Sequence, residues 1–490
     1  MTQSRTSKVL ALSFGNVLTS VVAIATSAVL ARLMSVDEFG TYRQVFLSYA
    51  VASPIISLGV NSGIYYFLSE EQSQRGNILY EAMILMLAMG GVYSVFILIG
   101  GNVALASRFS NPDLATLLLL TIPHAIVGLP AGLLAAVLVT SGEVKRLSVF
   151  NVVSNTSLGL VVIGVCIYWP RADYLVSAYV LVHAIFGFIA ILLILRASPL
   201  EFRKPEFKKI KILVSYSLPL GIATILGSLT IQLDKIIVSS TLSPVDFAIY
   251  SNGAIEIPLI GIVTGAISTI ILSEMSANCK AGLKERALDL FRKAAVRSGI
   301  IIFPAMAFLL VYAHEFITLI FSDKYQKSVD VFVIYLLALP VRIVMYGAAL
   351  MALNMTKFIL YRSIFDLLIN ALLSVILINI FGVYGAAVAT IITLFIWTVP
   401  VNIKMIAKGF GCGLKDVMPI KTLLEIAVIS FLAAIFCVVV SGFLAISGKL
   451  SNLIVGFILF GGSYACMAFL YIAEARDVFQ FIMKGFKRLV

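Results

Sequence analysis

The chain has 490 residues, of which 61% are hydrophobic and only 12% are charged, and its formal net charge is +12. A soluble protein of this length could not cover its surface with so few polar residues, so the composition excludes one. The positive charge does not indicate a nucleic-acid partner, because membrane topology and anionic lipid headgroups explain it better.

Apolar segments of roughly 20 residues recur along the chain, and each is long enough to cross a bilayer as a helix. Barrel strands would be about 10 residues long with an alternating pattern. We therefore predict an all-α polytopic membrane protein with about 14 transmembrane helices. The predicted spans are 8–34, 42–68, 78–100, 114–139, 149–169, 174–195, 212–239, 247–272, 299–321, 331–353, 363–380, 383–405, 422–446 and 453–472.

Basic residues are distributed unequally between the two sets of connections. If the N-terminus is cytoplasmic, that side receives about four basic residues for each one on the other side. This bias predicts that both termini lie in the cytoplasm. The five cysteines are far apart and have neither a disulfide pattern nor metal-ligand spacing, so we predict no metal and no cofactor.

The chain carries an internal repeat. A shift of 208 residues places Glu38, Phe39 and Tyr42 on Asp246, Phe247 and Tyr250, each set opening an equivalent span. An even number of spans separates the copies, so the halves run in the same direction, and repeats of this kind place a substrate site between lobes. The predicted division is an N-terminal six-helix lobe 1–195, a basic cytoplasmic linker 196–211, a second six-helix lobe 212–406, and two extra helices with a cytoplasmic tail in 407–490.

Polar side chains within the spans form stripes at helical spacing. Asn16 and Ser20 lie on one face of the first span, and Thr224 and Ser228 lie on the equivalent face of the seventh. Further stripes are Ser53, Ser57 and Asn61 in the second span, and Arg362, Asp366, Asn370 and Ser374 in the eleventh. Such stripes serve helix packing or line a hydrated cavity. The matching stripes on equivalent helices favour the cavity.

Charged groups within spans call for a partner or a function, since each costs about 2.5 to 3.5 kcal/mol at mid-membrane on insertion scales. Arg342 is predicted near the middle of the tenth span, where its guanidinium suits a phosphate or acidic sugar. Pairing with Glu256 or Asp234 is the competing interpretation. Lys235 and Asp234 lie toward the outer end of the seventh span, where snorkelling or a structural pair with Glu256 would also explain them.

The remaining polar groups carry less information. His124 and His183 are single residues in apolar helices, and we expect each to be satisfied by a carbonyl or hydroxyl rather than to form a proton relay. The sequence has no metal-ligand helix, nucleophile elbow or P-loop. These absences predict that the protein is not an enzyme.

Three segments carry a family resemblance. They are VLARLMS at 29–35 leading into EFGTY at 38–42, DKII at 234–237, and FGVYGAA at 381–387. They resemble the polysaccharide exporters, the Wzx-type O-antigen flippases of the multidrug/oligosaccharidyl-lipid/polysaccharide superfamily. The resemblance extends over essentially the whole chain through helix number and loop spacing.

This resemblance implies two six-helix bundles that move a lipid-linked oligosaccharide by alternating access. The typical carrier is undecaprenyl diphosphate, the location is the bacterial inner membrane, and the pathway is surface polysaccharide or lipopolysaccharide synthesis, with a polymerase and a chain-length regulator as partners. The substrate-binding candidates are Arg342, Lys235, Asn16, Ser20, Asn61, Thr224 and Ser228, and the gating or ion-coupling candidates are Asp234, Glu256 and Asp366.

Two other functions remain open at the level of sequence. A cation-coupled drug exporter of the same superfamily would use Glu256 or Asp366 as its proton site. That branch is expected to keep an ion-binding carboxylate in its first bundle, whereas the first span here has Asn16 but no acid. A membrane-embedded polymerase or ligase should have a large outer loop, and the longest predicted outer connection, 100–114, is short.

Overall fold

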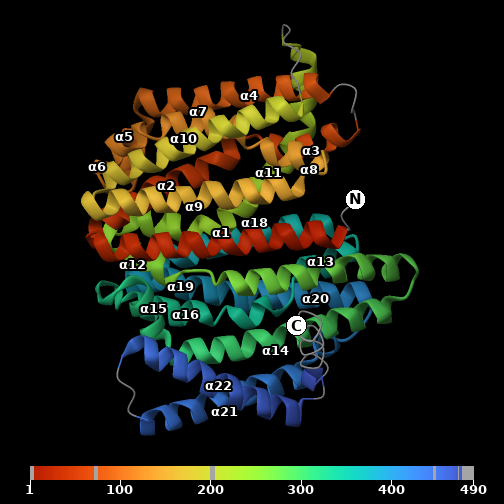
Figure 1. The fold of residues 1–490 in the computed structure, drawn as a ribbon. Helices are drawn as coiled ribbons and strands as arrows, with labels where there is room; N and C mark the ends of the chain where they lie inside the picture. The colour runs from red at the N-terminus through yellow and green to blue at the C-terminus, as the bar shows by residue number, and fades with distance from the viewer. Residues whose placement is uncertain (1–4, 71–74, 199–204, 445–447, 473, 477–490) are drawn as a thin grey trace. The chain divides into compact units, whose positions relative to one another are not determined.

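A computed structural model of the chain describes residues 5–70, 75–198, 205–444, 448–472 and 474–476 (Figure 1). Throughout these ranges the chain forms helices and no strands, as predicted. Residues 199–204 of the predicted linker, the end of the span 422–446 and the tail from 477 onward lie outside the described residues. The helices group into two compact units, Met1–Ile249 and Tyr250–Val490.

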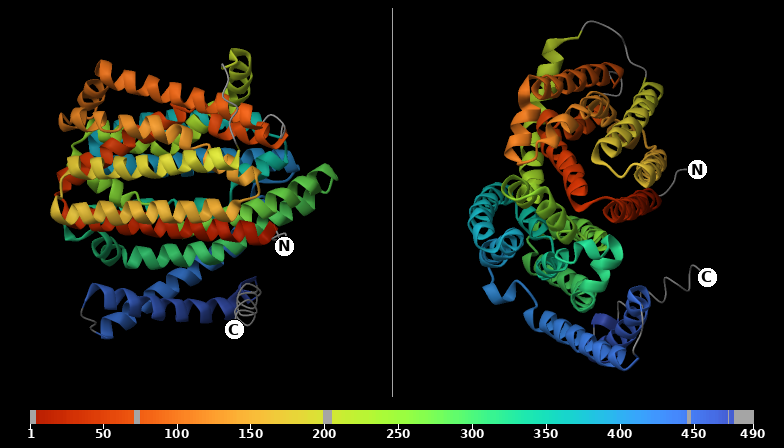
Figure 2. Two further views of the ribbon diagram at one scale, coloured as in Figure 1. Left: turned by 45° about the horizontal axis from the view of Figure 1, so that its top comes forward. Right: turned by 90° about the vertical axis from the view of Figure 1, so that its left-hand side faces the viewer.

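The first unit is built on α9 and α10, which pack along each other. α1 lies against α9, and α7 lies against both α4 and α10, as Figure 2 shows for α1, α9 and α10 in red, orange and yellow. α11 packs on α2 and α3. The bounds are α1 Arg5–Leu33, α2 Val36–Ile56, α3 Val60–Glu70, α4 Arg75–Phe96, η2 Ile97–Gly101, α5 Asn102–Arg108, α6 Asp113–Leu119, α7 Ile122–Ala131, α8 Leu134–Thr140, α9 Val144–Tyr168, α10 Ala172–Ala197 and α11 Phe207–Thr241.

The second unit is centred on α14, which packs against α13 and α21. α18 packs along α19, and α21 along α22. After α12 (Pro244–Gly253), which ends just inside this unit, the bounds are α13 Pro258–Lys280, α14 Lys284–Val311, α15 Ala313–Phe321, η3 Asp323–Tyr325, α16 Ser328–Leu336, η4 Leu339–Ile343, α17 Tyr346–Ala352, α18 Thr356–Phe381, α19 Val383–Ile392, η5 Thr393–Thr398, α20 Val399–Phe410, η6 Leu414–Asp416, α21 Ile420–Leu444 and α22 Lys449–Tyr471.

The described residues contain 11 helices that are long and apolar enough to cross a membrane, or up to 13 if each of two bent pairs is one span. Their outer surfaces carry large exposed apolar side chains such as Leu160, Leu181 and Phe188. In water this surface would be costly to expose, whereas lipid is as apolar as the side chains themselves. The prediction of a polytopic helical membrane protein is therefore confirmed.

The internal repeat appears at two helix corners. α1 ends at Leu33 and α2 begins at Val36, while α11 ends at Thr241 and α12 begins at Pro244, the same offset of 208 residues. Ser35 accepts a hydrogen bond from the Glu38 N–H at 3.2 Å, and Ser243 accepts one from the Asp246 N–H at 3.1 Å. Both corners thus begin with a serine N-cap, which satisfies a backbone donor that the helix itself leaves unpaired.

The predicted eighth span, 247–272, is not continuous. α12 stops at Gly253, residues 254–257 are not helical, and α13 begins at Pro258. The proline explains the break, since its ring disfavours helical backbone at the residue before it, and Ile257 is extended with φ −82° and ψ 107°. The prediction missed this break because it followed the apolar length of the segment and passed over Gly253 and Pro258, the residues on either side of the break.

Candidate functional site

Arg342 and Glu256 form a salt bridge at two interrupted helices of the second unit. The Arg342 Nη2 atom lies 2.9 Å from the Glu256 Oε1 atom. Glu256 belongs to the break between α12 and α13, and Arg342 belongs to the 3-10 segment η4, which contains Pro340 and follows α16. The prediction that Arg342 lies in a continuous helix is therefore wrong: α16 and the helix after it are bent by 44°.

The salt bridge is accessible. The Arg342 and Glu256 side chains are 43% and 59% exposed on the surface of the second unit. Beside them, the Tyr335 hydroxyl shares a hydrogen bond of 2.8 Å with the Tyr250 hydroxyl. Among the described residues, Glu256 is the one hydrogen-bond partner of the guanidinium, whose planar fork has five N–H donors. The guanidinium therefore has N–H groups left that can donate to further oxygen atoms.

The charged pair of the seventh span lies in α11 of the first unit. Asp234 is buried and its carboxylate accepts a hydrogen bond from the Lys235 backbone N–H at 2.8 Å. The Lys235 side chain is half-buried. Of the two interpretations left open for Arg342, pairing with Glu256 is the one observed, and phosphate binding by the paired guanidinium stays a prediction.

The predicted serine, threonine and asparagine residues do not gather in one pocket of the first unit. Asn16 is exposed on α1, and its carbonyl accepts a hydrogen bond from the Ser20 hydroxyl at 2.8 Å. Thr224 is exposed on α11 and donates to the Leu220 carbonyl at 2.9 Å, and Ser228 is half-buried on the same helix. Their roles in binding stay predictions.

Asp366 is buried between helices of the second unit. Its carboxylate accepts a hydrogen bond of 3.0 Å from the Thr398 hydroxyl and lies 3.6 Å from the Arg362 guanidinium. One turn further along α18, Asn370 donates to the Thr390 hydroxyl at 3.2 Å. The polar stripe of the eleventh span therefore faces neighbouring protein, which is the packing alternative.

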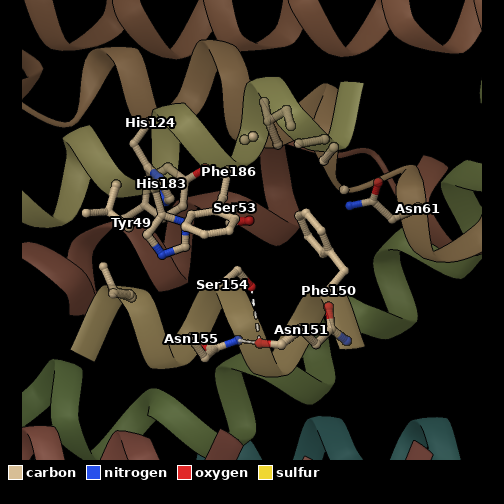
Figure 3. Close-up of a pocket in the computed structure, with 18 residues that line it drawn as sticks. Tyr49, Ser53, Asn61, His124, Phe150, Asn151, Ser154, Asn155, His183 and Phe186 are labelled. Atoms are coloured by element: carbon tan, nitrogen blue, oxygen red, sulfur yellow. Dashed lines mark hydrogen bonds between the residues drawn. The ribbon is translucent and has the colours of Figure 1, made fainter. Parts of the chain in front are cut away.

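A pocket of about 390 Å³ is formed by residues of the first unit, on α2, α3, α7, α9 and α10. It contains Asn61 of the predicted residues, and also Ser53 of the same stripe (Figure 3). Sequence analysis missed its other polar residues, which are Tyr49, His124, Asn151, Ser154, Asn155 and His183. One sequence pattern could have indicated the pocket: the spacing of Asn151, Ser154 and Asn155 puts all three on one face of α9.

The two histidines of this pocket pack against each other, and His124 contradicts an expectation. Their rings are 4.7 Å apart between centroids, and the His124 ring also packs on Tyr49 at 4.3 Å. The His124 Nδ1 atom is buried and has no hydrogen-bond partner in the described part of the chain. The expectation that each histidine is satisfied by a carbonyl or hydroxyl is therefore wrong for His124, because aromatic rings occupy the positions around it.

Comparison with known proteins identifies the family of the chain and related folds. A family model described as polysaccharide biosynthesis protein matches residues 29–330, more than half of the chain. The chain belongs to this family. A curated relative, the probable low-salt glycan biosynthesis flippase Agl15 of Haloferax volcanii, is 24% identical over 203 residues, 41% of this chain. That match spans only 43% of the relative's length.

Other similarities extend over more of the chain. An uncharacterized membrane protein of Methanocaldococcus jannaschii is 24% identical over 74% of this chain and 88% of its own length. The solved structure of lipid II flippase MurJ in its inward closed conformation matches with a TM-score of 0.72 and 15% identity, covering 96% of this chain and all of that one. An inward-facing multidrug transporter of the MATE family matches with a TM-score of 0.61 and 13% identity, covering 80% of this chain and 95% of the transporter chain. At these identities the solved structures show a shared fold.

Proposed function

We propose that the protein is a flippase that moves a lipid-linked oligosaccharide across the membrane by alternating access. The observation that carries this proposal is the agreement between family and fold. The family model is one of polysaccharide biosynthesis, and the match to the MurJ structure covers 96% of this chain and all of that one. The name of the Haloferax volcanii relative points the same way.

The physical need for such a protein is clear. Burying one unpaired hydroxyl in an apolar medium costs roughly 2 to 7 kcal/mol, and an oligosaccharide has many hydroxyls. A hydrated chamber replaces the lost hydrogen bonds while the polyprenyl tail stays in lipid. No covalent bond is made or broken, so the protein acts as a transporter.

In detail, we propose undecaprenyl diphosphate as the carrier, the bacterial inner membrane as the location, and both termini in the cytoplasm. The working lobes are 1–195 and 212–406, and the product feeds a polymerase and chain-length regulator of O-antigen or lipopolysaccharide synthesis. Arg342 and Lys235 bind the phosphates, Asn16, Ser20, Thr224 and Ser228 line the route, and Asp234, Glu256 and Asp366 serve gating or coupling.

The Arg342–Glu256 salt bridge suggests how binding is made reversible. Both groups stand at interrupted helices, a feature that marks substrate sites in many transporters. A diphosphate competes with the Glu256 carboxylate for the same guanidinium, since both offer two oxygens to its fork. Glu256 then restores the charge balance when the phosphate leaves.

The test is deletion of the gene in its own host. We expect loss of surface glycan and accumulation of lipid-linked oligosaccharide on the cytoplasmic side, both restored by the intact gene. A cation-coupled drug exporter is the second candidate because of the fold shared with the MATE transporter. Drug sensitivity that rises on deletion while surface glycan stays at wild-type level would establish that candidate and reject the flippase.

A further inference from the structure

We infer that the 390 Å³ pocket of the first unit binds an uncharged sugar residue of the transported headgroup, an inference that rests on the proposed flippase function. Such a site is built from residues of the first unit alone. It gives the protein a means of recognising sugars as well as phosphates.

The pocket has the size of a small-molecule site. Its volume of about 390 Å³ is within the range of roughly 300 to 1,000 Å³ for ligand pockets and accommodates a hexopyranose with its hydroxyls. Figure 3 shows His124, His183 and Tyr49 grouped at one side of the view and Asn61 standing at the other. Between these ends lie the rings of Phe150 and Phe186, whose centroids are 6.1 Å apart.

Among the described residues, the polar side chains that line the pocket can form hydrogen bonds, but none is an acidic residue, a lysine or an arginine. Hydroxyl, amide and imidazole groups line the pocket, and no Asp, Glu, Lys or Arg is among the described residues that do so. The Asn61 Oδ1 atom and the His124 Nδ1 atom are buried and have no hydrogen-bond partner in the described residues. Unpaired buried polar atoms are costly, so these two favour a ligand that bonds to them.

This lining selects among the parts of a lipid-linked glycan. A diphosphate requires cationic partners, which the pocket lacks, and a polyprenyl tail would leave the polar lining unpaired. A cationic drug would meet no carboxylate. A sugar ring offers hydroxyls to the amides, hydroxyls and imidazoles, and apolar C–H faces to Phe150 and Phe186, so it complements both features of the lining.

Two glycines on α7 and at its end keep the pocket open. A Cβ atom at Gly132 would lie 3.3 Å from the Asn61 Oδ1 atom, so any side chain there would displace the amide. A Cβ atom at Gly128 would lie 3.8 Å from both the His124 ring and the Tyr49 hydroxyl, which is ordinary contact. Gly128→Ala therefore narrows the pocket without straining the fold.

The first experiment measures surface glycan in the deletion strain carrying Asn61→Leu, at matched protein levels in the membrane. Losing one hydrogen bond to the sugar should slow export about three- to tenfold. Leucine should not destabilise the fold, because the Asn61 Oδ1 atom already lacks a partner. The control is Asn379→Leu, an exposed asparagine that bonds only the Val375 carbonyl of its own helix. Equal export by both variants, and by Gly128→Ala, overturns the inference.

A second pair of variants separates a sugar site from a proton site. Glutamine at His124 or His183 keeps neutral donors and acceptors but binds no proton near neutral pH, whereas phenylalanine keeps only a ring. A sugar site predicts that His124→Gln retains more export than His124→Phe, with an unchanged pH profile. If both variants lose export equally and the pH dependence disappears, the pocket carries a proton and the inference is wrong.

Direct binding is tested by protection of a cysteine in the pocket. Ser154→Cys is introduced into the full-length protein with its native cysteines replaced, and its labelling by N-ethylmaleimide is timed in proteoliposomes. The probe is the lipid-linked glycan extracted from the deletion strain, compared with the same extract after mild acid has removed the sugars. We expect only the intact glycan to slow labelling, about threefold or more.

The outcomes distinguish the two proposals. Protection by the sugar-free lipid as well would assign the pocket to the carrier and overturn the sugar site. If neither probe protects while the deletion strain still accumulates lipid-linked glycan, the sugar site fails and the flippase function stands. If the deletion strain accumulates none, the flippase function itself fails.

Discussion

The two units carry polar sites of opposite character. In the first, side chains of uncharged residue types, among them Asn61 and His124, line a pocket, and the second holds an exposed salt bridge between Arg342 and Glu256. In both, a polar group lies at or beside a helix break, since Asn61 follows the bend between α2 and α3. Interrupted helices thus place polar side chains within the spans of both units. We propose that the charge of these side chains decides which part of the lipid-linked headgroup, sugar or phosphate, each unit binds.

The largest effect is expected at Arg342, because a charge-assisted hydrogen bond to phosphate is worth about 1.5 to 3 kcal/mol. Arg342→Ala should lower glycan export roughly tenfold to a hundredfold while the protein still inserts in the membrane. Arg342→Lys should retain part of the activity, since it keeps the charge but loses the planar fork. If the alanine variant exports glycan at the wild-type level, Arg342 does not bind the phosphates and the second unit has no charged substrate site.

The Glu256→Gln variant tests whether the Glu256 carboxylate competes with phosphate for Arg342. Without the competing carboxylate, Arg342 binds phosphate more strongly and releases it more slowly. We expect half-saturation at a lower substrate concentration together with a turnover reduced about two- to fivefold, measured with purified lipid-linked glycan in proteoliposomes. A matched Asp246→Asn change, at an acid on α12 outside the break, should alter neither quantity. If Glu256→Gln instead weakens substrate binding and lowers turnover together, the salt bridge has a structural role.

A smaller effect is expected at the repeated helix corners, and it concerns stability. Ser35→Ala and Ser243→Ala each remove an N-cap and should each lower the free energy of unfolding by about 1 kcal/mol. Glu38→Ala should cost more than Asp246→Ala, because Glu38 also accepts a hydrogen bond of 2.6 Å from the Ala172 N–H at the start of α10, whereas Asp246 accepts from the neighbouring Ser243 hydroxyl. Thermal unfolding in detergent measures all four, and equal costs for the two acids would contradict this contrast.

The smallest effect is expected at the ion pair of Asp323, which lies in η3 outside the spans, with Lys449, the first residue of α22. The hydrogen bond from Lys449 lowers the pKa of the Asp323 carboxyl below its ordinary value of 3.8. A depressed pKa stabilises the fold above the ordinary value, and this contribution is lost as the pH falls through the lowered one. Asp323→Asn should therefore lower the melting temperature slightly at pH 7, with the difference shrinking below about pH 4. A difference that grows in acid would reverse the assigned sign.

The membrane class, the helical fold and the repeat could be predicted from the sequence, because they depend on local composition and on a short residue pattern that recurs after 208 residues. The break at 254–257 was not predicted, since the apolar residues on both sides of Glu256 continue the span and the signals of Gly253 and Pro258 are local. Nor could the pocket be found from the sequence, because His124 and His183 belong to different helices that only tertiary packing brings together. Asn61 was identified from its own stripe, but its partners could not be, since sequence spacing reports one helix at a time.

Close packing at Gly40 limits how far the two halves can be treated as copies. A Cβ atom there would lie 2.0 Å from the Pro244 carbonyl oxygen, so the backbones at the starts of α2 and α12 touch directly. The position equivalent to Gly40 is Ala248, which carries the methyl group that Gly40 has no room for. The halves are therefore not interchangeable: a chimaera that placed the second corner in both positions would put a side chain where only a hydrogen atom fits.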